Sequence, residues 1–491
     1  MPDESTSSLR TVTRGAGLFI AGRGISNILR FFINLLLTRS LGTSLYGIYS
    51  FGNITLSISL IFTNLGTDRS ILKFIPQFDG ERKHQNQILG LAALTSTGAS
   101  IVVAVGLYFA APWITAMTLN RPLETDVIQY FALLLPVSTL TNSIVSLFRS
   151  LELPKYHVLI SQIVVPLTRL VSVGIAFVIG LSLLGTVAAI VVGSVIAFLI
   201  AIRLFLLKTK LRPRRGSSRE MAVEFYDFSI PLTLSKAGSF LANRVDVLMV
   251  GIFLTSSAVG IYNVATLIAG LLTLPLAGFN QLFPSIASQL YSERKLNELE
   301  SIYCRVTRWT FTIALLMAIG AIVFRMEILT LFGEDFVAGH VVLVLFVFGQ
   351  LTNATVGPSG YLLMMTDHQY VTLVNQWVLG VFNVGLNYIL IQELGMIGAA
   401  VATASVLATV NLVRVGELWW LEGLFPYSHS FVKPLVAGVV AGVTMVMIRD
   451  LFSGLVSLFV GGGMGVLVFG VILVVLGIEQ GDRELFDEVI S

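Results

Sequence analysis

Residues 183–207 read LLGTVAAIVVGSVIAFLIAIRLFLL, and this stretch decides the class of fold. Arg203 is its only charged residue. A helix that crosses the hydrocarbon core of a bilayer needs about 20 mostly apolar residues. The strands of a membrane barrel would instead alternate polar and apolar residues over about ten positions. The stretch therefore predicts a membrane-spanning helix.

The composition of the whole chain agrees with this reading. Of 491 residues, 55% are apolar and 12% are charged, and the mean hydropathy is +0.86. A soluble domain averages about 25% charged residues, so this chain cannot cover a surface that faces water. A soluble enzyme, a nucleic-acid binder and a disordered protein are thereby excluded. A single cysteine, Cys304, rules out a disulfide framework, and the five histidines are scattered with no pair at metal-ligand spacing.

Thirteen further stretches resemble the first, which predicts an all-α, polytopic membrane protein with about 14 transmembrane helices. The predicted spans are 16–38, 45–66, 87–110, 124–147, 157–180, 183–207, 226–253, 259–282, 304–324, 339–357, 370–391, 395–414, 434–450 and 453–477. Residues 1–14 are polar and do not have the pattern of a cleaved signal peptide.

The basic residues predict the orientation. With the N-terminus inside, segments on the cytoplasmic side hold nineteen of the 31 lysines and arginines, and segments on the outer side hold four. Because basic loops stay in the cytoplasm, we expect a multi-pass protein of the plasma membrane with both termini inside. The basic run at 208–219 is read as a topology signal in a cytoplasmic linker; contact with anionic headgroups is the alternative.

A repeat divides the first twelve spans. At an offset of 213 residues, GIY at 47–49 falls on GIY at 260–262, Ser44 on Ser257 and Arg23 on Lys236. Six spans per half make a parallel repeat with its axis along the membrane normal. The predicted parts are the N-terminus 1–15, an N-lobe 16–207, the linker 208–225, a C-lobe 226–414, two further helices within 434–477, and a cytoplasmic tail 478–491.

Three cations are predicted close to the middle of the bilayer: Arg30, Arg169 and Lys236. A charge there costs roughly 2.5–3.5 kcal/mol, so each needs water or a partner. We expect them to line a cationic cavity between the two lobes, with buried structural hydrogen bonds as the alternative. Arg23 lies nearer the cytoplasm, as an entry contact or as a side chain that extends to the headgroups. Asp246 lies towards the outer end of its helix.

Polar side chains recur on single faces of several spans. The candidates for the lining of the cavity are Asn27, Asn34, Gln162, Asn243, Asn383 and Asn387. Polar faces on several helices cannot all point at lipid, although hydrogen bonds between helices would also account for any one of them. Arg244 and Asp246 face opposite ways on an unbroken helix, so a gate and an ion pair with another helix both stay open.

The positive sign of the buried charge indicates the class of substrate. A basic, partly desolvated cavity attracts phosphate, diphosphate or carboxylate and repels lipophilic cations. The sequence has no Gly-Lys-Ser phosphate loop, no paired-carboxylate motif and no histidine pair for zinc. We therefore expect a transporter that is not an enzyme, has no cofactor and no bound metal, and does not bind nucleic acid.

Several motifs then resemble a known family. These are GTSLYGIY at 42–49, VGIY at 259–262, PSIA at 284–287, GYLLMM at 360–365, NVGLN at 383–387 and GMIGAA at 395–400. The chain resembles the polysaccharide transporter proteins, which are oligosaccharide-lipid (O-antigen type) flippases of the multidrug/oligosaccharidyl-lipid/polysaccharide, MATE-like exporter superfamily. The resemblance covers roughly residues 15–475.

The resemblance implies two six-helix lobes that move a polyprenyl-linked glycan across the membrane by alternating access, with two extra helices beside the lipid tail. The expected partners are a polyprenyl phosphate- or diphosphate-linked oligosaccharide, the bilayer and glycan-assembly proteins, and we expect the protein to work as a monomer. Coupling to an H⁺ or Na⁺ gradient or to the membrane potential stays open. A cation-coupled multidrug or metabolite antiporter is the alternative, and a non-transporting member of a glycan-assembly complex is a third.

Overall fold

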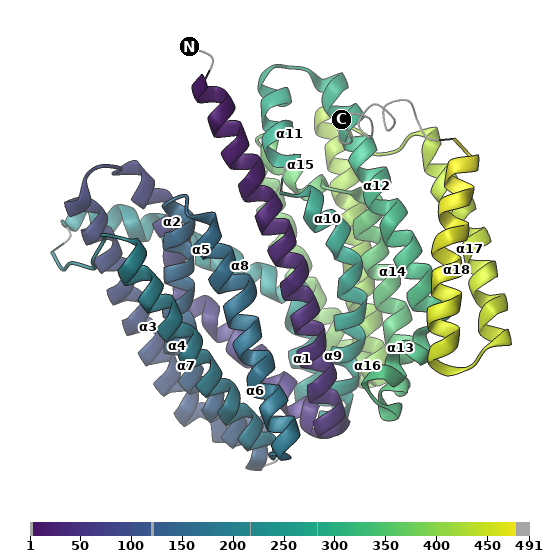
Figure 1. The fold of residues 1–491 in the computed structure, drawn as a ribbon, viewed down its shortest axis with the longest axis horizontal. Helices are drawn as coiled ribbons and strands as arrows, with labels where there is room; N and C mark the ends of the chain where they lie inside the picture. The colour runs from purple at the N-terminus through teal and green to yellow at the C-terminus, as the bar shows by residue number, and fades with distance from the viewer. Residues whose placement is uncertain (1–2, 119–121, 217, 282, 478–491) are drawn as a thin grey trace. The chain divides into compact units, whose positions relative to one another are not determined.

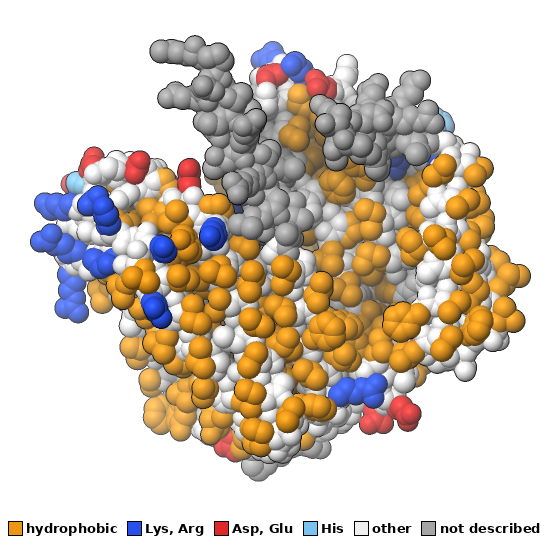
Figure 2. All heavy atoms as spheres, in the orientation of Figure 1, with side chains coloured by type: hydrophobic (Ala, Val, Ile, Leu, Met, Phe, Trp, Pro, Cys, Tyr) orange, Lys and Arg blue, Asp and Glu red, His pale blue; other side chains and the backbone are white. Residues whose placement is uncertain are grey.

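The computed structural model describes residues 3–118, 122–216, 218–281 and 283–477. The predicted tail 478–491 and the first two residues of the predicted segment 1–15 lie outside this range. All regular elements in the described part are helical, as the prediction of an all-α protein requires. Hydrophobic side chains cover most of the helical surface that Figure 2 shows, and lysine and arginine side chains gather in a few groups.

The main helices follow one another with short connections (Figure 1). They are α1 (Asp3–Asn64), α2 (Thr67–Gln77), α3 (Arg82–Met117), α4 (Pro122–Ser150), α5 (Pro154–Val158), the π-helix η1 (Leu159–Val164), α6 (Val165–Ile179), α7 (Leu183–Lys208), α8 (Arg219–Phe253), α9 (Ser256–Gly270), α10 (Leu274–Phe279), α11 (Phe283–Ser292), α12 (Leu296–Val323), α13 (Arg325–Phe332), α14 (His340–Val356), α15 (Ser359–Met365), α16 (Gln369–Glu422), α17 (Val432–Leu451) and α18 (Gly454–Val475).

The number of membrane spans agrees with the sequence. Eleven helical stretches of the described chain are long and apolar enough to cross a bilayer. Two of them, Gly22–Gln77 and Gln369–Glu422, are each two spans joined at a glycine with positive φ, 69° at Gly42 and 59° at Gly395. Helix α8 is also long enough, at 35 residues, and its charged side chains lower its hydropathy. Together these make fourteen helices.

Contacts divide the chain into two compact units, Met1–Gly260 and Ile261–Ser491. The first unit contains α1 to α8 and the start of α9. Helix α8 belongs to it through packing against α1, α2 and α3. The repeat predicts that the linker 208–225 separates the two lobes. This boundary remains a prediction, because a division of the chain by contacts does not test a division by internal repeat.

The basic linker is fixed to α3 by its backbone. The amide of Arg214 donates to the carbonyl of Asn86 at 2.9 Å, and the amide of Arg212 donates to the Asn86 side chain at 2.7 Å. The side chain of Gln87 donates to the carbonyl of Gly216 at 2.6 Å. Since these bonds use the backbone, the linker is held in place whatever the charges of its side chains.

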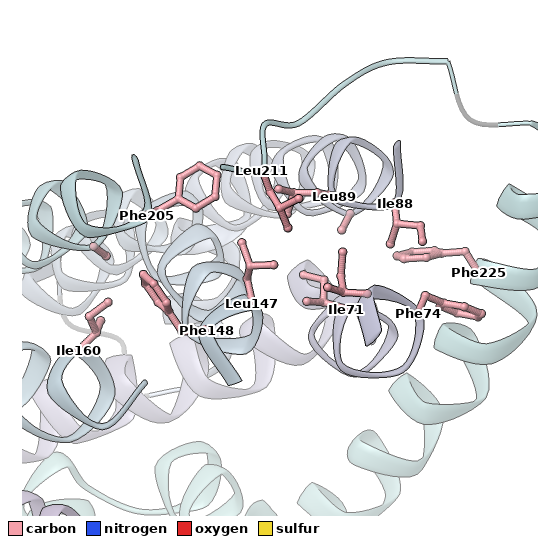
Figure 3. Close-up of a cluster of buried hydrophobic side chains, with 13 residues drawn as sticks. Ile71, Phe74, Ile88, Leu89, Leu147, Phe148, Ile160, Phe205, Leu211 and Phe225 are labelled. Carbon is pink, nitrogen blue, oxygen red and sulfur yellow. The ribbon is translucent and has the colours of Figure 1, made fainter. Parts of the chain in front are cut away.

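The linker also closes a hydrophobic core in the first unit. Leu211 is buried among side chains from α2, α3, α4, α7 and α8 (Figure 3). The labelled members of this cluster are Ile71, Phe74, Ile88, Leu89, Leu147, Phe148, Ile160, Phe205, Leu211 and Phe225. The rings of Phe74 and Phe225 stack with centroids 6.1 Å apart. This core therefore fixes α2 against α8.

The two segments that carry the repeated GIY motif meet each other. At the 213-residue offset, Thr43 corresponds to Ser256, Ser44 to Ser257 and Gly47 to Gly260. A Cβ atom at Gly47 would lie 1.7 Å from the carbonyl oxygen of Ser256, and one at Gly260 would lie 2.2 Å from that of Thr43. The hydroxyls of Thr43 and Ser257 are 3.5 Å apart. Those of Ser44 and Ser256 are 2.9 Å apart.

Each contact that a residue of one segment makes with the other segment is thus repeated by the corresponding residue of the other segment. Contacts exchanged in this way are what a two-fold axis between two like segments produces. A two-fold axis is also the relation that a parallel repeat predicts. The absence of a side chain at Gly47 and Gly260 is what allows the two backbones to approach so closely.

Replacing Gly47 by alanine tests this close approach. We expect Gly47→Ala to lower the free energy of unfolding by about 1–3 kcal/mol, because the new methyl group overlaps the Ser256 carbonyl. The measurement is thermal unfolding of the purified protein in one detergent. The matched control is Gly98→Ala in α3, where a Cβ meets nothing within 4 Å and alanine is the better helix former. Equal unfolding midpoints for the two variants would contradict the packing argument.

Candidate substrate site

Three of the predicted cations gather in the first unit. Arg23 and Arg30 lie on α1, and Arg169 lies on α6. Arg30 interacts electrostatically with both of the others, with Arg169 the stronger of the two. Arg30 is exposed, whereas Arg23 and Arg169 are partly buried. Like charges repel, so this arrangement favours an anion that neutralises them; guanidinium groups can bind phosphate through two parallel hydrogen bonds.

Arg169 is held in place by the second half of α1. One of its terminal nitrogens donates to the side-chain oxygen of Asn53 at 2.8 Å and also to the hydroxyl of Tyr49. Its Nε atom is buried and has no hydrogen-bond partner. Neutral groups thus orient the guanidinium of Arg169 without compensating its charge.

A second tyrosine joins the two halves of α1 across the break at Gly42. The hydroxyl of Tyr46 donates to Asn34 at 2.8 Å, and the Asn34 amide donates to the carbonyl of Arg30 at 2.8 Å. The rings of Tyr46 and Tyr49 stack with centroids 6.1 Å apart. Asn34, predicted as cavity lining, therefore supports the helix turn that carries Arg30.

Gln162 lies against α1 on a widened helical turn. It belongs to the π-helix η1, which precedes Pro166 near the start of α6. A Cβ atom at Gly22 would lie 3.5 Å from the Cβ atom of Gln162, so α1 approaches this turn one residue before Arg23. π-helical turns are uncommon and occur frequently at functional sites.

Lys236 has an acidic partner that we did not predict. Its Nζ atom lies 2.9 Å and 2.7 Å from the two carboxylate oxygens of Asp68, and the two side chains are 33% and 22% exposed. Lys236 is seventeen residues from either end of α8. Asp68, which the predicted span 45–66 left in a loop, therefore lies opposite the middle of a long helix. Lys236 therefore forms an ion pair, and its charge is compensated by Asp68.

A break in the chain brings Asp68 to this position. Leu65 and Gly66 have φ angles of 42° and 69° and end one helix before α2 begins. A Cβ atom at Gly66 would lie 2.3 Å from the carbonyl oxygen of Ser229 on α8. Asp68 then stands in the first turn of α2, where the helix dipole favours a negative charge.

Four further predicted residues lie on helices of the first unit and differ in their exposure. Asn27 is partly buried on α1, and Asn243 is exposed on α8 with its amide on the carbonyl of Ser239 at 2.8 Å. Arg244 is exposed and Asp246 is 2% exposed, so they face different sides of α8, as their spacing predicts.

In the second unit, Asn383 and Asn387 are fully buried and joined by a 2.8 Å hydrogen bond. The structure thus relates Arg30 to Arg23 and Arg169 through their charges and to Asn34 through a hydrogen bond, and it places Gln162 against α1. It shows Lys236 paired with Asp68. Whether any of these residues binds substrate remains a prediction.

Sequence reasoning missed four residues of this site: Tyr46, Tyr49, Asn53 and Asp68. The first three lie within the motif and span that follow Gly42, and spacing on one helix does not show what another helix places beside it. The pair Leu65-Gly66 was the available signal for Asp68, because glycine inside an apolar helix marks a break. Among the described residues, no group of three or more His, Cys, Asp or Glu could hold a metal ion.

The ion pair predicts an energetic coupling between Asp68 and Lys236. We expect Asp68→Asn and Lys236→Gln each to destabilise the protein, because each leaves one charge without its partner. The double variant should recover part of the loss, with a coupling energy of about 1–3 kcal/mol. The measurement is chemical unfolding of the four proteins in one detergent.

The exposed pair Glu293 and Lys295 provides the control for this cycle. Their side chains are 37% and 55% exposed, so their coupling should be smaller, because water screens an exposed ion pair. A coupling between Asp68 and Lys236 no larger than in this pair would contradict a structural role for the contact.

Solved structures with a similar fold are transporters. The lipid II flippase MurJ, in an inward closed conformation, matches with a TM-score of 0.75 at 13% identity, over 96% of this chain and 100% of that one. An inward-facing multidrug resistance MATE family transporter of the MOP superfamily matches with a TM-score of 0.62 at 18% identity, over 80% and 93%. At these identities the likeness shows the fold.

Sequence comparisons lead to the same group. A curated relative, the probable low-salt glycan biosynthesis flippase Agl15 of Haloferax volcanii, is 27% identical over 256 residues. The match spans 50% of this chain and about half the length of that relative, 53%. The MatE family model matches residues 231–389. The model of the polysaccharide biosynthesis protein family matches residues 12–290, more than half of the chain. The chain therefore belongs to the polysaccharide biosynthesis protein family.

Proposed function

We propose that the protein is a flippase that moves a polyprenyl phosphate- or diphosphate-linked oligosaccharide across the membrane by alternating access. The observation that carries this proposal is the group of Arg23, Arg30 and Arg169, in which Arg30 interacts through its charge with each of the other two. The names of the relatives support it, since one is a probable glycan biosynthesis flippase and one is a lipid II flippase. Such a transporter serves surface polysaccharide or glycoprotein glycan synthesis.

The three arginines suit successive parts of this task. Arg30 is exposed and would contact the phosphate directly. Arg169 is oriented by Asn53 and would hold the phosphate from the facing helix. Arg23, two turns earlier on α1, would meet the headgroup first. Amide groups such as those of Asn27 and Gln162 would bind hydroxyls of the sugars.

Lys236 would act differently from the arginines. It already has two short contacts with Asp68, so a phosphate could engage it only by replacing that carboxylate. Such an exchange would free Asp68 and alter the contact between α2 and α8. Binding of the anion would in this way be linked to a change in helix packing.

Sidedness, location and energy source belong to the same proposal. The bias of basic residues supports cytoplasmic termini and a plasma membrane location. We propose that the protein works as a monomer and has no cofactor, with an H⁺ or Na⁺ gradient or the membrane potential as the driving force. Its partners would be the lipid-linked oligosaccharide and glycan-assembly proteins.

Removing Arg30 tests the role of the arginine group. We expect Arg30→Ala to slow the appearance of the oligosaccharide in the outer leaflet about tenfold or more, which corresponds to the loss of one charge-assisted contact. The variant should not unfold at a lower temperature than the unchanged protein, because the substitution removes a repulsive charge. The measurement uses cells that depend on the variant and an impermeant glycan-cleaving enzyme, with a melting curve of the purified variant.

Arg203→Ala is the matched control for this experiment. Arg203 is an exposed arginine within a membrane helix, α7, and it is not part of the group. Its removal should leave the rate of transport unchanged. Full activity of Arg30→Ala would remove Arg30 from the mechanism.

A cation-coupled multidrug or metabolite antiporter is the second candidate. The match of residues 231–389 to the MatE model favours it. The two functions differ in the sign of the substrate, since three clustered arginines repel a lipophilic cation. Export of such a cation at the same rate from vesicles with Arg30→Ala and with the unchanged protein would favour the antiporter.

A further inference from the structure

An apolar cavity of about 230 Å³ lies in the first unit, between α2, α3, α4, α7 and the linker that follows α7. Its lining includes Ile71, Leu89, Ala93, Leu147, Phe205 and Pro213. Figure 3 shows four of these side chains, each from a different helix: Ile71, Leu89, Leu147 and Phe205. The cavity is thus enclosed by elements that the hydrophobic core already holds together.

The cavity suits a hydrocarbon and not water. Ser143 is the one polar residue among the described lining residues, and its hydroxyl donates to the carbonyl of Thr139 at 3.1 Å. Apolar cavities stay dry and bind apolar molecules. A cavity of about 150 Å³ binds benzene, which has six carbon atoms, so this cavity has room for about nine. Because an empty cavity costs stability in proportion to its volume, a chain that fills it would stabilise the first unit.

The cavity has exposed residues at its edge. Leu206, near the end of α7, is 48% exposed, and Pro213 in the linker is exposed as well. Helix α7 is long and apolar enough to cross a bilayer, so we expect its exposed apolar side chains to meet lipid. A hydrocarbon chain of the bilayer could therefore enter the cavity beside Leu206.

The linker holds its part of the rim in a fixed position. A Cβ atom at Gly90 on α3 would lie 2.0 Å from the carbonyl oxygen of Arg214, so the linker backbone lies directly on α3. The amides of Arg212 and Arg214 both donate to Asn86. Pro213 stands between these two anchored residues, so the rim of the cavity is formed without a ligand.

Arg212 places a cation at the same rim. Its Nη2 atom donates to the carbonyl of Leu206 at 3.1 Å, and its Cζ atom lies 5.6 Å from the ring centroid of Phe205; both of these residues line the cavity. Its Nη1 atom donates to the carbonyls of Thr209 and Leu211 at 3.0 Å and 2.6 Å.

The guanidinium of Arg212 keeps donors for a further ligand. A guanidinium has five N–H groups, and the three hydrogen bonds to carbonyls use three of them. Nε and one N–H of Nη2 thus have no partner among the described residues. Two neighbouring N–H groups of this kind match two oxygens of a phosphate. The rim of the apolar cavity therefore presents a site for a phosphate.

We propose that the first unit binds one anionic phospholipid of the bilayer, with its phosphate on Arg212 and one acyl chain in the apolar cavity. The cation and the cavity meet at Phe205 and Leu206, so one molecule can occupy both. Bulk phospholipids far outnumber other phosphate lipids in a bilayer, and mass action favours the ligand in excess. None of the three arginines of the candidate substrate site belongs to the lining.

This site would link the binding of lipid to the packing of α2. Ile71 lines the cavity and follows Asp68 by three residues, or about one helical turn. An acyl chain against Ile71 would therefore support the turn of α2 that carries the contact of Asp68 with Lys236.

The test is native mass spectrometry of the purified full chain, freed of lipid in a neutral detergent and titrated with phosphatidylglycerol. We expect one tightly bound lipid, and about tenfold weaker binding for Arg212→Gln, which removes the charge-assisted contact. Ala93→Phe leaves Arg212 in place and fills the cavity from its wall, so it should also weaken binding about tenfold or more. Because Arg212 also bonds the last carbonyls of α7, Ala93→Phe keeps the test decisive if Arg212→Gln does not fold.

Arg215→Gln is the matched control. Arg215 is an exposed arginine of the same linker and is not among the lining residues. Its removal changes the net charge of the protein as much as Arg212→Gln does. This variant should bind phosphatidylglycerol like the unchanged protein.

Four results would overturn the proposal. One is unchanged affinity in a folded Arg212→Gln or Ala93→Phe variant. Another is an equal loss in Arg215→Gln and Arg212→Gln, which would indicate a diffuse attraction to the basic linker. A third is equal binding of phosphatidylcholine, whose net charge is zero. The fourth is tighter binding of a polyprenyl phosphate that Ala93→Phe abolishes, because the occupant would then be the carrier. Transport is not the readout, so these results are independent of the proposed flippase function.

Discussion

Every polar group and charge within a bilayer must be satisfied inside the protein or by water, and the structure of the first unit depends on this constraint. Asp68 compensates Lys236 with two short contacts. Arg169 is bound by the neutral Tyr49 and Asn53, which orient it and leave its charge in place. Arg30 stays exposed between like charges. Lys236 is thus neutralised within the fold, whereas the groups that hold Arg169 leave its charge uncompensated.

Helices that carry such groups must also approach one another closely, and glycine allows this. Gly66 ends a helix and brings Asp68 against α8, since a side chain there would overlap the backbone at Ser229. Gly47 and Gly260 let two related segments meet with their contacts exchanged. In lipid, where the hydrophobic effect does not drive helices together, small residues and hydrogen bonds supply the association. The compensation of buried charge and the close packing of the helices therefore both follow from the lipid surroundings.

The sequence predicted the spans and their number because these depend on properties of single helices. Hydrophobic length marks each span, and depth is set by distance along the helix. Most of what it did not predict depends on two parts of the chain at once. The partner of Lys236 lies across a helix break at Leu65-Gly66, and the hydrogen-bond partners of Arg169 come from the other half of α1. The linker was predicted from its charge, but its backbone fixes it to Asn86. Asn383 and Asn387, expected to line a cavity, are fully buried against each other.

The central claim is that this chain, by itself, carries a phosphate-linked glycan lipid between leaflets. The most direct measurement reconstitutes the purified protein into vesicles that contain a fluorescent polyprenyl diphosphate oligosaccharide. An impermeant glycan-cleaving enzyme, added outside, reports the fraction of the lipid in the outer leaflet over time. The account predicts that cleavage proceeds past the half that is accessible in protein-free vesicles and approaches completion. Cleavage that stops at the same half with and without the protein, under each imposed ion gradient and membrane potential, would contradict it.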